Sequence, residues 1–193
     1  MKAQNRIAFK EWAVIIQAIT QKKQSIILRK GGIHEKKGRF QVEHEEFFLF
    51  PTYEHQNKAD LKSSVHADLA RLQELYKSPQ EISIECFVEV KKVVRVTSLN
   101  RLKNIYDFHV WSEQAVEKRF NYGEEKGLFL LLVKPFKLAH QHLISNLNRY
   151  AGCKSWVELA EPLSTDGSIS LVTNQELASL SAMIDKSLTS GAP

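Results

Sequence analysis

The chain has 193 residues, and 43% of them are hydrophobic, which is enough for one domain with a sizeable core. No apolar run approaches the ~18–20 residues that a membrane span needs, and residues 1–12 lack the apolar segment of a secretory signal. The two cysteines, Cys86 and Cys153, lie far apart, which argues against a disulfide scaffold. The composition therefore predicts a reduced, cytoplasmic protein without a membrane partner.

The net charge of +5 is unevenly distributed along the chain. Residues 1–40 contain ten Lys or Arg and two Glu, whereas the rest contains seventeen Lys or Arg and twenty Asp or Glu. A basic region of this kind favours a polyanionic partner, because neutralising phosphates releases counterions. An ordinary solvated surface with a basic bias explains the same counts equally well.

The first elements in chain order are a helix and two strands. Residues 6–20 are predicted to form a helix, because apolar residues recur at helical spacing: Ala8, Trp12, Ile15, Ile16 and Ile19. The β-branched segment 25–30 predicts a strand that "GG" at 31–32 breaks. A second strand is expected over 39–52, ended by Pro51.

The middle of the chain predicts a helix over 58–76 and a strand over 81–96. In that strand alternation places Ile84, Cys86, Val88 and Val90 on one face. Ser112 is expected to cap a helix that runs to Phe120, and a further apolar strand covers 127–138.

The composition changes near residue 164, after which Ser, Thr and Gly become frequent. We therefore expect one domain over 1–163 and a tail over 164–193 with a single helix, begun by the capping-box pair Thr173 and Glu176. The narrow apolar stripe of this helix fits packing on the core or on another subunit, so a homo-oligomer through this helix is one expectation. The element order predicts an α+β fold rather than a doubly wound parallel sheet.

Two resemblances extend this interpretation. The segments "KEWA", "LRKGGI", "FPTYEHQ" and "SWVEL" resemble signature segments of a bacterial family of unknown function, over about residues 8–160. Some members of that family stand beside restriction-endonuclease domains, which implies a link to foreign or modified DNA.

The layout is also similar to ASCH domains of the PUA-like superfamily, in which an N-terminal helix leads into a strand with the pattern G-x-K-x-x-E-x-R. This second resemblance implies a mixed β-barrel flanked by helices, with relatives that bind RNA or modified bases. Arg29 matches the pattern, but Gln24 stands at its Lys position and Ile27 at its Glu position. The resemblance therefore does not imply the small-molecule amidohydrolase activity of some ASCH-like proteins.

A cationic segment follows the strand over 25–30. A glycine-containing turn with flanking cations suits a phosphate, which Arg29 would bind through two N–H groups. The predicted phosphate-binding residues are Arg29, Lys30, Lys36, Lys37 and Arg39. A hairpin with ordinary solubilising charge explains the segment almost as well, and the sequence has no Walker-type phosphate loop.

Base contacts are predicted in "FPTYEHQ". Loop aromatic and polar side chains on the rim of a barrel stack on an unpaired base and bind its edge. The predicted base-binding residues are Tyr53, Glu54, His55 and Trp111, although core packing is the alternative for both aromatic side chains.

An enzymatic alternative rests on Glu85, Glu89 and Lys91, which alternation places on one face of the strand over 81–96. Two carboxylates and a lysine are the set that a metal-dependent nuclease uses around Mg²⁺. Short metal-binding patterns such as HExxH or CxxC do not occur, and we predict neither a resident metal nor a cofactor.

The sequence thus favours a domain that binds DNA or RNA, with a modified base as one candidate ligand and a role in restriction or RNA metabolism. A metal-dependent nuclease or nucleoside-type hydrolase is the alternative, so enzymatic activity stays open at this stage.

Overall fold

The computed structural model describes residues 2–31, 33–36, 39–76, 80–152 and 154–190. Its strands are β1 (Gln4–Trp12), β2 (Ile26–Arg29), β3 (Ile33–Lys36), β4 (Arg39–Val42), β5 (Glu46–Thr52), β6 (Glu81–Val96), β7 (Leu128–Ser145), β8 (Trp156–Ser164) and β9 (Ile169–Ser170). Its α-helices are α1 (Ala13–Thr20), α2 (His66–Leu75), α3 (Leu99–Lys103), α4 (Glu113–Asn121) and α5 (Asn174–Thr189). The predicted α+β class is confirmed.

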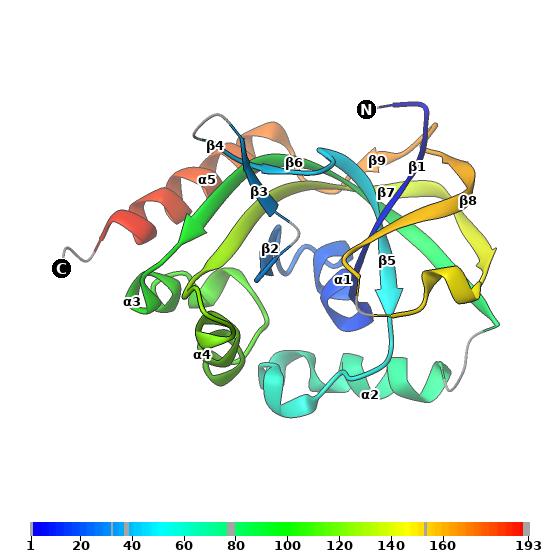
Figure 1. Ribbon diagram of the computed structural model, residues 1–193. Helices are drawn as coiled ribbons and strands as arrows, with labels where there is room; N and C mark the ends of the chain where they lie inside the picture. The colour runs from blue at the N-terminus through cyan, green and yellow to red at the C-terminus, as the bar shows by residue number, and fades with distance from the viewer. Residues whose placement is uncertain (1, 32, 37–38, 77–79, 153, 191–193) are drawn as a thin grey trace.

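One seven-stranded sheet organises the fold, in the order β2-β7-β6-β5-β1-β8, with β9 added beside β7. β6 and β7 arch over the molecule, with α1, α2 and α4 beneath the arch (Figure 1). The two ends of the hydrogen-bonded order, β2 and β8, do not pair with each other in the described residues. The sheet is therefore strongly curved, but the predicted barrel is not closed by backbone pairing.

Both faces of the central strands are buried, which explains the continuous apolar run in β5. Phe47 and Leu49 belong to the core beneath the arch, which also contains α1 and parts of α4 and α5. Phe48 and Phe50 face the opposite way, into a second core that includes residues of β7 and β8. A strand buried on both faces has no polar alternation.

The prediction of a helix over residues 6–20 is wrong in its first half. Residues 4–12 form β1, which pairs in parallel with β5 and antiparallel with β8, and the helix α1 begins only at Ala13. Apolar residues at 7, 8 and 9 fit either a buried helix or a central strand, and the two strand partners decide between them. The helix predicted over 58–76 is likewise shorter, because two 3₁₀ turns precede α2.

Two local features also correct the expected strands. β5 continues through Pro51, because β6 pairs only with residues 46–48 and so leaves the side of β5 at Pro51 without a partner strand. β6 spans the predicted residues 81–96, but a bulge between Ile84 and Cys86 reverses its faces. Ile84 therefore lies in the second core and Cys86 in the first, and the two do not share a face as predicted.

The C-terminal helix α5 packs on the chain's own core through the predicted stripe. Leu177, Ile184 and Leu188 are buried there. No helix in the described part of the chain is long and apolar enough to span a membrane.

We expect Thr173→Ala to destabilise the protein by about 1 kcal/mol, because it removes the N-cap of α5. The Thr173 hydroxyl accepts a hydrogen bond from the Glu176 N–H, and the Glu176 carboxylate accepts one from the Thr173 N–H, which confirms the predicted capping box. Urea unfolding measures the effect, and Ser179→Ala, an exposed change within the same helix, is the control. Equal losses in both variants would contradict a specific capping role.

Candidate functional site

The most distinctive polar arrangement lies where β1, β2 and β5 end. β1 and β5 are parallel, so their carboxyl ends meet at one edge of the sheet, with Trp12 opposite Thr52. Five side chains gather there, which we call the arginine–tryptophan cluster: Glu11, Trp12, Arg29, Trp111 and Arg119.

Arg29 bridges the unpaired side of the sheet between β2 and β1. Its guanidinium donates to the carbonyl oxygen of Lys10 and, at 2.7 Å, to the hydroxyl of Ser155. The same group lies 3.6 Å from Glu11 Oε2 and 4.5 Å from the centre of the Phe9 ring. Side-chain bonds from one arginine thus connect the strands that backbone pairing leaves apart.

Glu11 is the buried anion of the cluster, with 3% of its side chain exposed. Its Oε1 accepts a hydrogen bond from the Trp12 N–H. Oε2 has no hydrogen-bond donor among the described residues and forms an ion pair with Arg29. A buried carboxylate needs such a compensating charge.

Arg119, in the last turn of α4, is the second cation of the cluster. Its guanidinium carbon lies 3.5 Å from the centre of the Trp111 ring and 5.5 Å from that of Trp12. Burial lowers the pKa of Arg119, which Glu11 partly opposes. Arg119 forms no ion pair or side-chain hydrogen bond with another residue in the described ranges, so a half-buried, partly dehydrated guanidinium keeps its donors available.

Of the predicted phosphate ligands, only Arg29 belongs to this cluster. The ammonium of Lys30 donates to the carbonyl oxygens of Phe120, Glu125 and Gly127, so its three N–H groups are used to hold the segment after α4. The cationic segment does contain a hairpin, but it joins β3 to β4, with Lys36 opposite Arg39, whereas β2 pairs with β7. Lys37 lies outside the described residues.

The predicted base-binding residues differ in how far their side chains are exposed. Tyr53 stacks on Tyr76 with ring centres 4.1 Å apart, and burial together with that contact raises its pKa. Glu54 and His55 are exposed in the loop after β5. Trp111 does not offer its ring to a base as expected, because only 1% of the residue is exposed and Arg119 covers one face of its ring.

The predicted nuclease residues do not gather as a set. Glu85 and Lys91 each lie at a bulge of β6. Glu85 accepts a hydrogen bond from Ser83, whereas Glu89 pairs with Lys91 at 2.7 Å. Burial raises the pKa of Glu89, but the Lys91 ammonium outweighs it and holds that pKa below its ordinary value. Among the described residues no three His, Cys, Asp or Glu side chains are grouped to hold a metal.

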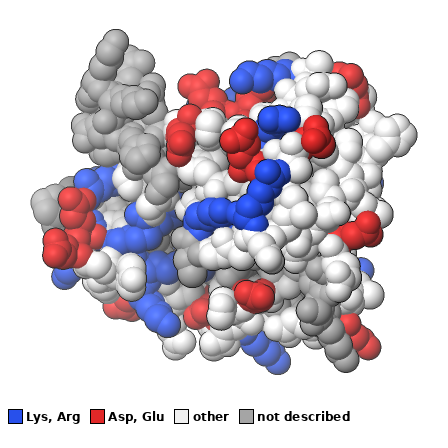
Figure 2. All heavy atoms as spheres, turned by 45° about the vertical axis from the view of Figure 1, so that its right-hand side comes forward, with Lys and Arg blue, Asp and Glu red and all other residues white. Residues whose placement is uncertain are grey.

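On one face of the molecule, Lys and Arg side chains form a band that runs from the left-hand edge towards the centre (Figure 2). Acidic side chains lie above this band and at its left end, so the basic surface is local.

Glu11, Trp12 and Arg119 are not among the functional residues that the sequence predicts. Trp12 was assigned to the apolar stripe of a helix, and Arg119 is one of several cations in a charged helical segment. The available signal was the charged residue Glu11 inside the largely apolar segment 7–19, since a charge that is buried with such a segment needs a partner.

A comparison with solved structures finds similarities with TM-scores below 0.5. The chain is similar to the crystal structure of ASCH from Zymomonas mobilis, with 12% identity and a TM-score of 0.48 over 91% of this chain and 93% of that one. Two single-substitution mutants of the same protein give TM-scores of 0.46 and 0.45, at 11% and 12% identity, over 95% and 91% of this chain and 99% and 96% of theirs.

A search of the curated proteins finds no match. The model of the family described as "Domain of unknown function (DUF1802)" matches residues 8–183, which is most of the chain. This protein therefore belongs to the DUF1802 family.

Proposed function

We propose that the arginine–tryptophan cluster binds the phosphate backbone of a single-stranded nucleic acid. The observation that carries the proposal is Arg119, a half-buried guanidinium that lies beside a second arginine and forms no ion pair or side-chain hydrogen bond with the described residues. Partial burial strengthens a charge-assisted hydrogen bond, and a guanidinium matches the geometry of phosphate oxygens.

The surroundings of the cluster favour a single strand over a duplex. Glu54 and His55 are exposed beyond the end of β5, the strand that is paired with β1 beside Trp12. Side chains of this kind contact the edges of unpaired bases, ordinary or modified, whereas stacked bases in a duplex hide those edges. Lys36 and Arg39, on the hairpin β3–β4 that follows β2 in the chain, stay predicted phosphate ligands from the sequence.

We expect Arg119→Ala to weaken binding of a fluorescent single-stranded oligonucleotide by about tenfold or more, because one charge-assisted contact is lost. The salt dependence of binding should also decrease by about one unit in its logarithmic slope. Fluorescence anisotropy over a range of salt concentrations measures both effects with RNA, DNA and duplex probes.

The matched control is Lys118→Ala, which removes one positive charge from the neighbouring exposed position of α4. It should retain most of the affinity. Equal losses of affinity in both variants would mean that binding depends on general surface charge and not on this site. Incubation of the protein with the same probes and Mg²⁺ tests the hydrolytic alternative. Cleavage that is lost in Glu89→Ala would contradict this proposal and identify the protein as a nuclease.

A further inference from the structure

A separate pocket lies between the turn after α1, the segment around Phe108 and the start of α5. Its volume is about 240 Å³, somewhat below the ~300–1,000 Å³ typical of sites for drug-sized ligands. Val172, Leu177 and Leu180 supply apolar surface from the α5 side, and Phe108 supplies an aromatic ring. The pocket therefore has the size and lining for a small, partly apolar molecule.

The turn that forms one wall of this pocket contains an unusual residue. α1 ends in a Schellman motif, in which the Lys23 N–H donates to the Ala18 carbonyl and the Lys22 N–H to that of Ile19. Lys22 occupies the left-handed position of this motif, with a φ of 61°, where glycine is the usual residue. A lysine at this position costs stability, and such strain often accompanies a functional side chain.

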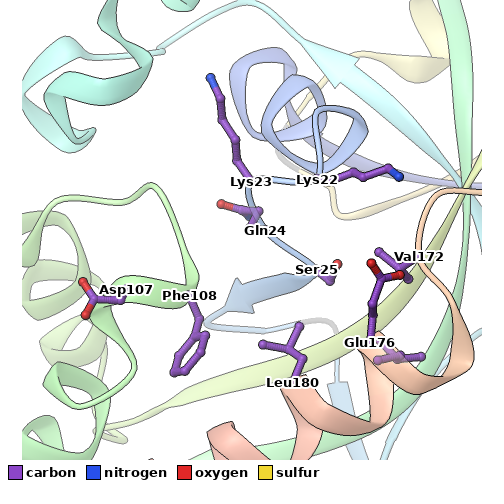
Figure 3. A pocket seen from close by; sticks show the side chains of 10 residues that line it. Lys22, Lys23, Gln24, Ser25, Asp107, Phe108, Val172, Glu176 and Leu180 are labelled. Atoms are coloured by element: carbon purple, nitrogen blue, oxygen red, sulfur yellow. The ribbon is translucent and has the colours of Figure 1, made fainter.

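The rim of the pocket carries two opposite charges. Lys22 and Glu176 extend along the same side of the pocket, whereas Lys23 and Asp107 point away from the other labelled side chains (Figure 3). Lys23 is already paired with Asp68 at 2.9 Å. Lys22 forms no ion pair or side-chain hydrogen bond with Glu176 or with any other residue in the described ranges.

The Glu176 carboxylate is held in place by the capping box of α5. One of its oxygens, Oε2, accepts the Thr173 N–H at 2.7 Å, so the rotamer of the exposed side chain is fixed at the mouth of the pocket. An ammonium and a carboxylate held in this way complement a ligand that carries both opposite charges.

We propose that this pocket binds a small apolar α-amino acid in its zwitterionic form. The ligand carboxylate pairs with Lys22, the ligand ammonium pairs with Glu176, and the ligand side chain packs against Phe108 and Leu180. This site lies outside the arginine–tryptophan cluster, and the proposal does not depend on nucleic-acid binding.

Isothermal titration calorimetry with L-leucine and L-phenylalanine tests the proposal on the full chain. We expect binding of at least one of them at millimolar concentration or below. N-acetyl-L-leucine lacks the ammonium, L-leucinamide lacks the carboxylate and glycine lacks the apolar side chain. Each should bind about tenfold more weakly or worse, which corresponds to the loss of one principal contact.

The decisive variant is Lys22→Gly, which should weaken amino-acid binding by about tenfold while raising the thermal midpoint, because glycine relieves the left-handed strain. Leu180→Trp should abolish binding by filling the pocket, and Lys186→Ala, an exposed lysine on the same helix, should not change it. The proposal is overturned if neither amino acid binds at millimolar concentration, or if Lys22→Gly binds as tightly as the unmodified protein.

Discussion

Arg29→Ala is expected to destabilise the protein by roughly 3–5 kcal/mol, the usual cost of breaking a buried ion pair by removing one partner. The substitution leaves the Glu11 carboxylate, 3% exposed, without the one cation that forms an ion pair with it among the described residues. It also removes the bonds to Lys10 and Ser155 that join β2 to the opposite side of the sheet. The change should appear as a lower urea midpoint with an unchanged slope.

A second substitution separates the two costs, that of the unpaired Glu11 carboxylate and that of the lost hydrogen bonds of Arg29. In the double variant Glu11→Gln/Arg29→Ala the buried charge is absent, so part of the lost stability should return. If Arg29→Ala unfolds within about 1 kcal/mol of the unmodified protein, the assignment of Arg29 as the structural bridge is wrong.

Stability is expected to fall by about 2 kcal/mol between about pH 7.5 and pH 5, because His109 must stay neutral in the fold. Burial, together with the neighbouring Lys62 ammonium, lowers the pKa of His109 to about 3. Neither ring nitrogen has a hydrogen-bond partner in the described part of the chain.

The direction of this effect follows from proton uptake by the unfolded chain. His109 takes up a proton near its ordinary pKa of about 6.5 when unfolded, but only near 3 when folded. The stabilising contribution is therefore complete above about pH 6.5 and decreases as the pH falls towards 3, by about 1.4 kcal/mol for each pH unit.

Urea unfolding at the two pH values measures this loss. His109→Phe should be about as stable as the unmodified protein at the higher pH and should lose about 2 kcal/mol less at the lower one. His140→Gln, a change at an exposed histidine, should behave like the unmodified protein. A His109→Phe variant with the same acid sensitivity as the unmodified protein would contradict the assignment to His109.

Elements with a strong local signal were predictable from the sequence. The strand over 81–96 alternates and is rich in β-branched residues, and the capping residues Ser112 and Thr173 identify the starts of α4 and α5. Elements whose structure depends on partners far away in the sequence were not predictable. β1 was predicted as a helix because its strand character depends on β5 and β8, and β8 itself, which contains Pro162, carries too weak a pattern to be recognised.

The same distinction applies to the candidate site. Arg29 was predicted from a local pattern, but its partners Glu11 and Ser155 are contributed by distant strands. Arg119 depends on a contact with Trp111, which lies before the start of its own helix and packs against Trp12 of β1. Lys30 is an error in the opposite direction. Its local pattern predicted a phosphate ligand, but its ammonium donates to backbone carbonyl oxygens of a neighbouring segment.

The most direct test of the proposed function is to observe the Arg119 guanidinium while the nucleic acid binds. The ¹⁵N-labelled arginine Nε–H resonances can be recorded in the intact protein, with the Arg119 signal assigned by its absence in Arg119→Lys. On titration with a single-stranded oligonucleotide we predict that this resonance shifts, because a phosphate oxygen accepts from the guanidinium, whereas that of the exposed Arg101 stays nearly constant. Binding that shifts other arginine resonances and leaves that of Arg119 unchanged would contradict the proposed function.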